Sequence, residues 1–397
     1  MREKKRTRIL VAVNDDLVTD ARVHRVCSSL FRQGYEPLLI GRLLHGKNLP
    51  VQRDYPTRRF PMWTRGGIFF YAEFNLRLLC TLLKTRGNAI LCNDTDALIA
   101  CRLAAWWKHL PLIFDAHELF PELPEVVGRR WVRTFWTKTE DLIFPHLKYT
   151  YTVCRSIADY YLKRYGLHMG VVRNIPPREV AAEPAQSAAP FPESAAAFPE
   201  KSRMKILLYQ GAINVGRGLE WIIDAMPYLD DCMLYICGDG DCMDAMRRRA
   251  EASPARGRIV FTGRVPHAQL YRYTRQADLG FVLLEQLGLS YYYALPNRIF
   301  DYMRCGVPIL ASDFPEIRRI VQECGSGRLT DRHDPQHLST LIRAMLREWT
   351  PEKREALRRK AKAYCWENEA GIMLDTVARA LGTQPRKATG RARLSHA

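Results

Sequence analysis

Short apolar runs alternate with amphipathic stretches along most of the chain. In the first half, β-forming residues dominate the runs RILVAVN, EPLLIGR, AILCND, PLIFDA and YTYTVC. Between these runs lie amphipathic segments such as ARVHRVCSSLFRQG, in which Val23, Val26, Cys27 and Leu30 fall on one helical face. Strand–helix alternation of this kind predicts a parallel sheet with helices on both faces.

The alternation stops at residues 176–203, which are rich in Ala, Pro, Glu and Ser and predict an interdomain linker or a surface insertion. It restarts with the apolar runs MKILLYQG, CMLYICGDG, RIVFTGRV, LGFVLLE and PILASD, and with helical patterns near 218–229, 241–251, 266–275, 296–305 and 335–349.

We therefore expect an α/β protein with two doubly wound domains, over 1–175 and 204–350. Helices over 351–383, which in one arrangement cross back to the first domain, and a basic tail over 384–397 complete the chain. Two such domains facing each other form a cleft at the carboxyl ends of both sheets, where ligands bind in this architecture.

The stretch SYYYALPNRIFDYMRCG, residues 290–306, predicts a short helix that opens at Pro296, Asn297 and Arg298 and stops at Gly306. The unpaired amides and the dipole of its first turn favour an anion. Asp301, about one turn deeper, is suited to accept hydrogen bonds from a ribose diol. The pattern indicates a nucleoside-diphosphate pocket, and an ordinary surface aspartate is the alternative.

The segment YQGAINVGRGLE places a glycine-flanked loop after a predicted strand. Gly211, Gly216 and Gly218 allow the backbone to approach a ligand closely. Arg217 offers a permanent forked charge for a pyrophosphate. Gly238, in CGDG after another strand, joins this set, although a lone GxG more often marks a tight turn.

In the first half, the sequence Asp115-Ala-His117-Glu118 ends the strand PLIFDA. An imidazole between two acids can orient a proton or bind sugar hydroxyls. A metal site and a structural histidine are the alternatives. Asp15, after the first strand, is a candidate for the acceptor side, and a plain polar turn is the alternative.

Composition narrows the class of protein. The 397 residues carry a formal charge of +18, and residues 1–175 hold 28 Lys and Arg against 16 Asp and Glu. This asymmetry suggests an anionic partner, such as a membrane surface or a phospholipid acceptor, with a solvated basic surface as the alternative. Nothing resembles a nucleic-acid recognition module, so we expect no nucleic acid partner.

No run approaches the ~20 apolar residues that span a bilayer, and the N-terminal apolar run is too short for a signal peptide. We expect a cytoplasmic protein, with a peripheral position at the inner face of the membrane as an option. For GGIFFYAEFNLRLLCTLLKTRG, residues 66–87, burial is favoured over membrane docking. The eleven cysteines show no zinc spacing, so we expect reduced thiols and no metal.

The order YQG…GRGLE, CGDG, FTGRV and LPNRIFDYMRCGVPILASDFPEI resembles the retaining glycosyltransferases of the GT-B fold, group 1 or family 4. FDAHELFPE and NDDLVTDARVHRVCSSLFRQGYEPLLIGR look like a subgroup common in bacterial surface-polysaccharide gene sets. The resemblance covers nearly the whole chain and is strongest over 205–325.

The resemblance implies roles for individual positions. Asp301 matches the acid that holds the nucleotide ribose, and Arg217 matches the lysine that grips the diphosphate. His117 matches the histidine that approaches the donor sugar. Tyr293 stands where the family has a glutamate that touches the donor sugar, and this departure puts that contact in question.

The resemblance implies metal-independent, cofactor-free transfer of a sugar from a nucleoside-diphosphate sugar to a saccharide, glycolipid or polyprenyl-linked acceptor in envelope assembly. Two alternatives remain open. One is a nucleotide-sugar-binding protein without activity, which Tyr293 favours. The other is a nucleotide-sugar epimerase built on the same fold.

Overall fold

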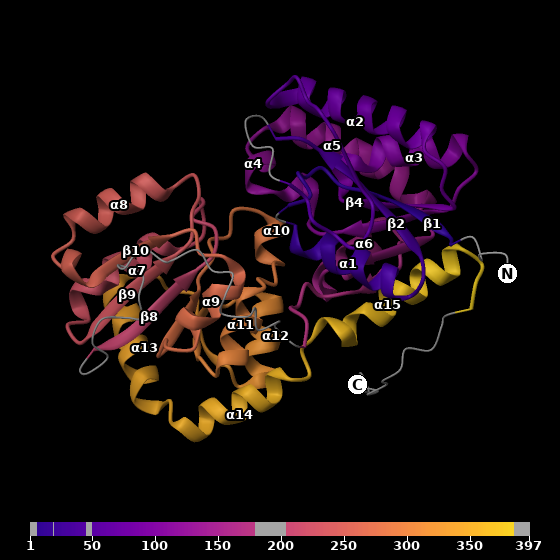
Figure 1. Ribbon diagram of the computed structural model, residues 1–397. Helices are drawn as coiled ribbons and strands as arrows, with labels where there is room; N and C mark the ends of the chain where they lie inside the picture. The colour runs from indigo at the N-terminus through magenta and orange to yellow at the C-terminus, as the bar shows by residue number, and fades with distance from the viewer. Residues whose placement is uncertain (1–5, 19, 45–49, 179–203, 385–397) are drawn as a thin grey trace. The chain divides into compact units, whose positions relative to one another are not determined.

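The computed structural model describes residues 6–18, 20–44, 50–178 and 204–384. The chain divides into two units. Unit 1 holds residues 1–174, 288–290 and 366–397, and unit 2 holds residues 175–287 and 291–365. Both units are shown in Figure 1. Most of the predicted linker, residues 179–203, and the tail from 385 lie outside the described residues.

Unit 1 is built on a seven-stranded parallel sheet in the order β3-β2-β1-β4-β5-β6-β7. Its strands are β1 (Arg8–Ala12), β2 (Glu36–Arg42), β3 (Thr57–Phe60), β4 (Ala89–Asn93), β5 (Leu112–Ala116), β6 (Tyr149–Thr152) and β7 (Gly170–Val171). The central strands β1, β4 and β5 are almost wholly buried, which explains their continuous apolar runs.

Helices cover both faces of this sheet. They are α1 (Ala21–Arg32), α2 (Gly67–Lys84), α3 (Leu98–Trp107), α4 (Pro124–Val127), α5 (Arg130–Ile143), α6 (Arg155–Tyr165) and α15 (Trp366–Ala380). α1 and α15 share one core with the sheet, through residues such as Val26, Leu30 and Met373. α2, α3 and α5 lie together on the other side of it (Figure 1). Asp20 caps α1 by accepting a hydrogen bond from the amide of Val23.

Unit 2 repeats the architecture with a six-stranded parallel sheet in the order β10-β9-β8-β11-β12-β13. Its strands are β8 (Lys205–Gln210), β9 (Cys232–Cys237), β10 (Ile259–Gly263), β11 (Leu279–Val282), β12 (Ile309–Ser312) and β13 (Gly327–Thr330). One hydrophobic core packs on each face of the sheet.

The helices of the second half are α7 (Leu219–Ala225), α8 (Met243–Ala252), α9 (His267–Thr274), α10 (Leu289–Tyr292), α11 (Arg298–Cys305), α12 (Pro315–Cys324), α13 (Pro335–Glu348) and α14 (Pro351–Ala361). α11 ends at Gly306, whose φ of 69° lies in the left-handed region that favours glycine. The prediction of an α/β protein with two doubly wound domains is confirmed.

Two details differ from the sequence-based expectations: the edge strands and the burial of α2. β3 and β13 were not predicted, and neither was the two-residue β7. Among the described residues, no helix has the length and apolarity to cross a membrane. In α2 the expected burial holds for only one side, since Phe70, Phe74 and Leu78 are buried while Phe69 and Leu76 are exposed.

Candidate active site

In unit 2, two loops at the carboxyl ends of β8 and β9 touch through glycines. A Cβ added to Gly238 would lie 1.9 Å from the carbonyl oxygen of Gly211, so no larger residue fits there. Gly218 begins α7 with φ of 67°. Gly211 and Gly216 also have positive φ, and Gly216 packs against Leu287. These glycines are explained by the packing of the chain itself, and their contact with a ligand stays a prediction.

Arg217 lies in the loop between β8 and α7. Its guanidinium carbon is 4.7 Å from the ring centroid of Tyr291, within cation–π range, and its buried Nε has no hydrogen-bond partner in the structure. The side chain is half-buried. The ring of Tyr291 thus holds the Arg217 guanidinium in place, and its contact with a diphosphate stays a prediction.

Arg298, the first residue of α11, is the most unusual cation of this unit. Its side chain is only 7% exposed, and Nη1 donates to the carbonyl oxygen of Gln210 at 3.1 Å. The guanidinium lies 5.1 Å from the ring centroid of Tyr209. Its Nε and Nη2 are buried without a hydrogen-bond partner, and no ion pair of Arg298 occurs among the described residues. A buried charge without a counter-ion is costly, so the site favours an anion.

Asp301 lies one turn further along α11 in a buried polar cluster. It is 6% exposed, and it accepts long hydrogen bonds from Gln210 Nε2 at 3.4 Å and from the Tyr271 hydroxyl at 3.3 Å. Thr274 Oγ1 donates to Gln210 Oε1 at 2.8 Å. Burial raises the pKa of Tyr271, and the charge of Asp301 adds to the shift. Asp301 is thus part of the interior of unit 2 rather than a surface aspartate.

The start of α11 differs from the prediction. The helix begins at Arg298 with the exposed Asn297 as its N-cap, so Pro296 precedes the helix instead of forming its first turn. The reason is a tighter turn: the amide of Ile299 bonds to Pro296 O at 3.1 Å, and the amide of Phe300 bonds to Asn297 O at 3.0 Å. Two amides expected to be open to an anion are therefore already engaged.

Tyr293 lies just before this turn. It is half-buried, and its ring centroid is 5.4 Å from that of Tyr292. A tyrosine at this position cannot supply the negative charge of a carboxylate.

In unit 1, His117 lies between two carboxylates at the ends of β4 and β5. Nδ1 is 3.0 Å from Asp94 Oδ2, and Nε2 is 3.1 Å from Asp115 Oδ2, the latter without the geometry of a hydrogen bond. The amide of His117 also donates to Asp94 Oδ1 at 2.7 Å. Burial alone would lower the pKa of His117, but the two carboxylates outweigh it and hold this pKa well above its usual range. The two carboxylates therefore favour the protonated form of the imidazole.

Asp115 is held from the other side by Arg22 of α1. Arg22 Nε and Nη2 donate to the two carboxylate oxygens at 3.0 and 2.7 Å, and Nη1 donates to Val172 O at 2.8 Å. Both side chains are almost fully buried. Burial raises the pKa of Asp115, but the charge of Arg22 outweighs it, and the pKa lies below the usual range.

Asp94 has an unusual backbone, with φ of 63° and ψ of 165°. This region is essentially restricted to glycine, and such strain often occurs at functional sites. Nearby, Asn14 donates to Asp96 at 2.7 Å and accepts from Arg42 Nε at 2.6 Å. Burial and then the charge of Asp94 raise the pKa of Asp96 to about 7.

The remaining candidates are less specific. Asp15 Oδ1 accepts from the amide of Leu17 at 2.8 Å and so stabilises the turn after β1, while burial raises the pKa of Asp15 to about 6. The side chain of Glu118 is exposed. Within the described parts of the chain, no group of three or more His, Cys, Asp or Glu is arranged to hold a metal ion.

Sequence reasoning named His117, Asp301 and Arg298, whose roles stay predictions, and it did not name Arg22 and Asp94. A signal existed for Asp94, because β4 and β5 are adjacent in a parallel sheet and the residues after both strands meet at one edge. The sequence held no such signal for Arg22, because this residue looked like a polar residue beside the apolar face of α1.

Two α/β units with arginines in the loops after the strands are compatible with many reactions. The comparisons with known proteins are more specific. Residues 191–364 match the family described as "Glycosyl transferases group 1", and residues 20–177 match the "Glycosyltransferase Family 4" description. The chain belongs to the GT-B glycosyltransferases of group 1 and family 4.

Individual relatives are distant. The chain is 23% identical to a D-inositol 3-phosphate glycosyltransferase of Xylanimonas cellulosilytica over 189 residues, 46% of this chain and 44% of that one. It is 24% identical to a GDP-mannose-dependent alpha-(1-6)-phosphatidylinositol dimannoside mannosyltransferase of Mycobacterium tuberculosis over 43% of either chain. The match therefore spans less than half the length of these curated relatives.

A solved structure is similar over almost its whole length. The chain superposes on Anabaena Alr3699/HepE in complex with UDP-glucose with a TM-score of 0.70 and 14% identity, covering 94% of this chain and 98% of that one. At this identity the similarity concerns the fold alone.

Proposed function

We propose that the protein is a retaining glycosyltransferase that moves a sugar from a nucleoside-diphosphate sugar to a hydroxyl group. The acceptor we propose is a saccharide or lipid-linked saccharide of the cell envelope. The main support is Arg298, a buried guanidinium beside Gly211 with two buried nitrogens that bond to nothing in the structure. A diphosphate is an anion of suitable charge and geometry for such a fork.

In this proposal, Arg298 and Arg217 bind the diphosphate, and Asp301 accepts hydrogen bonds from the ribose. When the sugar–phosphate bond breaks, negative charge grows on the leaving diphosphate. Two fixed guanidinium groups stabilise that charge without reorganising. Loss of one such donor typically raises the barrier by ~2.7–4 kcal/mol. We infer metal-independent transfer because both cations come from the chain itself.

For His117, the family resemblance implies a contact with the donor sugar. The two flanking carboxylates favour the protonated ring, so we propose that His117 acts as a fixed cation and hydrogen-bond donor and not as a general base. No carboxylate is assigned as a nucleophile, which favours attack of the acceptor on the same face that the diphosphate leaves.

Two observations support an envelope role with a lipid-linked acceptor. One distant relative is named a phosphatidylinositol dimannoside mannosyltransferase, and most of the net positive charge lies in the first half of the chain.

The test is nucleotide binding by Arg298→Met, with Arg272→Met as the matched control. Arg272 is an exposed arginine on α9 of the same unit. Calorimetry with UDP, GDP and ADP should show one preferred nucleotide, and R298M should bind it at least tenfold more weakly while R272M binds it normally. Equal binding by R298M would exclude the diphosphate role.

Transfer is tested separately by incubating the protein with the preferred nucleotide sugar and membrane lipid extracts. Sugar incorporation that R217A and R298M lack would support the reaction. Tight nucleotide binding with neither transfer nor donor turnover would instead identify a binding protein, the alternative that Tyr293 favours. Turnover of donor without acceptor would identify an epimerase.

A further inference from the structure

Exposed large apolar side chains are concentrated on one face of unit 1. Among the described residues, only four exposed large apolar side chains lie outside this face: Leu162, Val215, Tyr228 and Ile372. We call the others the tryptophan face: Trp63, Ile68, Phe69, Leu76, Leu83, Leu103, Trp106, Trp107, Trp131, Phe135 and Leu142. They belong to α2, α3 and α5 and to the turn before α2.

The helix α2 shows why this face is unusual. Over its 18 residues, one side packs on the protein through Phe70, Phe74 and Leu78. The opposite side presents Phe69 and Leu76, at helical spacing, to solvent. A helix that is apolar all round is normally buried or in contact with lipid, and α2 has protein on one side only.

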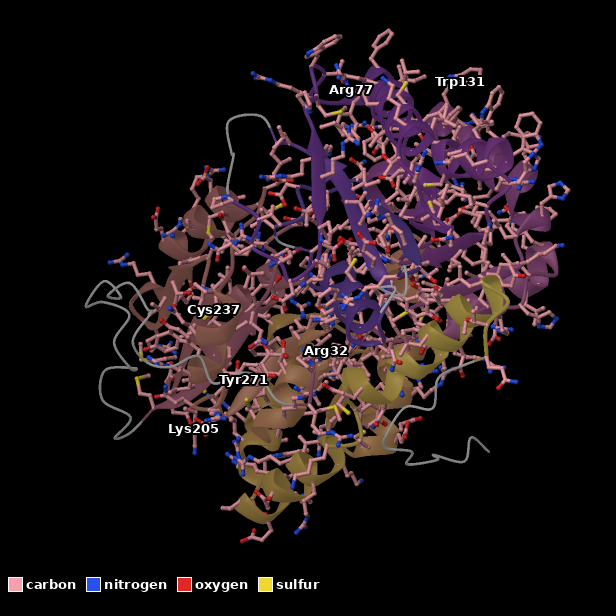
Figure 2. All side chains as sticks on the ribbon, turned by 45° about the vertical axis from the view of Figure 1, so that its right-hand side comes forward. Arg32, Arg77, Trp131, Lys205, Cys237 and Tyr271 are labelled. Carbon is pink, nitrogen blue, oxygen red and sulfur yellow. The ribbon has the colours of Figure 1, made fainter. Side chains whose placement is uncertain are left out.

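The three helices form a continuous layer. Tyr71 of α2 packs edge-on against Trp136 of α5, with ring centroids 5.1 Å apart, and α2 also packs against α3. Figure 1 shows α2, α3 and α5 side by side on the same side of the sheet. In Figure 2, the labelled Arg77 and Trp131 both lie at the outer margin of unit 1. Trp131 is 90% exposed.

Cations border this face. The guanidinium of Arg77 lies 4.2 Å from the ring centroid of Trp63. Further exposed cations lie at the ends of α2 and along α5: Arg65, Lys84, Arg86, Arg130, Arg133 and Lys138. Of the nearby acids, Glu73 is bound by Arg77 at 2.7 Å, and Asp141 by Arg164 at 3.1 Å. Glu125, before α5, is exposed, and no ion pair of Glu125 occurs among the described residues.

We propose that the tryptophan face docks on an anionic lipid bilayer. Tryptophan favours the membrane interface because its ring is apolar while its N–H stays hydrated. Exposed Lys and Arg beside such residues add attraction to anionic headgroups. A second copy of this chain fits less well, because a two-fold interface would place the cationic border of one copy against that of the other. The proposal does not depend on the proposed reaction.

The first test is co-sedimentation of the full-length protein with vesicles. Binding to vesicles that contain phosphatidylglycerol should be strong, and binding to pure phosphatidylcholine should be weak. The tryptophan emission should shift to the blue on binding. The double variant Trp107→Ser/Trp131→Ser should lower the partition coefficient at least about tenfold. Lys84→Glu/Arg86→Glu should lower it by about 25-fold or more, since each cation contributes about fivefold.

The matched controls are Tyr228→Ser and Ile372→Ser, which remove exposed apolar side chains elsewhere and should leave binding unchanged. Thermal unfolding and circular dichroism check that each variant is folded. Absence of vesicle binding by the wild type, or equal binding by W107S/W131S, would overturn the proposal. A dimer in sedimentation velocity that W107S/W131S abolishes, without vesicle binding, would identify a second copy as the occupant.

Discussion

Replacing Arg22 by methionine tests the buried charge network of unit 1. The change keeps an unbranched side chain of similar length and removes the guanidinium. Asp115 then loses two hydrogen bonds, of 3.0 and 2.7 Å, and keeps its contact with His117. The carbonyl of Val172 loses its donor as well. Both charged side chains are buried, so water cannot replace the lost bonds.

The expected cost follows from that geometry. Removal of one partner of a buried ion pair typically costs about 3–5 kcal/mol, because the other charge stays buried without compensation. The pH dependence has a definite sign. In the wild type the pKa of Asp115 is depressed, which contributes stability above about pH 4 and is lost as the pH falls further. In the variant, the Arg22 charge that opposes the effect of burial is lost, so this pKa should be higher than in the wild type and the difference in stability between the two proteins should grow from pH 4 to pH 7.

The assay is urea unfolding at pH 5 and pH 7, with hydrogen exchange of the β5 amides to localise the effect in unit 1. Arg155→Met is the control, since Arg155 forms an exposed pair with Asp159 and should cost less than about 1 kcal/mol. The double variant R22M/D115N should be more stable than R22M. A loss below about 1 kcal/mol in R22M, or the same loss at both pH values, would refute this reasoning.

Three further predictions concern stability. Burial raises the pKa of Glu140 to about 8, so the wild type should lose stability as the pH rises from about 4.5 to 8. Glu140→Gln should flatten a plot of melting temperature against pH. An unchanged slope would contradict this prediction. Gly238→Ala should destabilise unit 2 by about 1–3 kcal/mol in urea unfolding, because its Cβ would overlap the carbonyl oxygen of Gly211. The Cβ of Gly257→Ala meets nothing within 4 Å, so this control should be near neutral. Equal effects of the two changes would argue against the close approach of Gly238 to Gly211. Tyr302→Phe should cost about 1 kcal/mol in the same assay, because its buried hydroxyl donates to Leu208 O at 2.8 Å; a neutral result would mean that this bond is weak.

The architecture was predictable because the central strands are buried on both faces and therefore appear as uninterrupted apolar runs. The missed strands lie at sheet edges. β3 reads TRRF and β13 reads GRLT, and such charged or glycine-containing segments resemble loops. An edge strand has one open side where charge is tolerated. Pattern alone therefore identifies the centre of a sheet better than its margins.

The candidate site was predictable where a residue follows a strand directly, as His117 does. It was not predictable where function depends on a partner distant in sequence. Arg22 and Asp115 are separated by 93 positions, and only the folded sheet brings them together. The expectation that α2 is buried was half wrong for a related reason. Periodicity shows that a helix has apolar sides, but it does not show how many of those sides have neighbours.

The last helix of the chain has a consequence for synthesis on the ribosome. Trp366 and Met373 of α15 belong to the same core as β1 and α1, and Glu369 binds Arg173 at 2.6 Å. A nascent chain that has completed the seven strands of unit 1 still lacks α15, and its core stays incomplete until nearly 200 more residues have been translated. We expect the incomplete unit to require a chaperone until α15 has been translated.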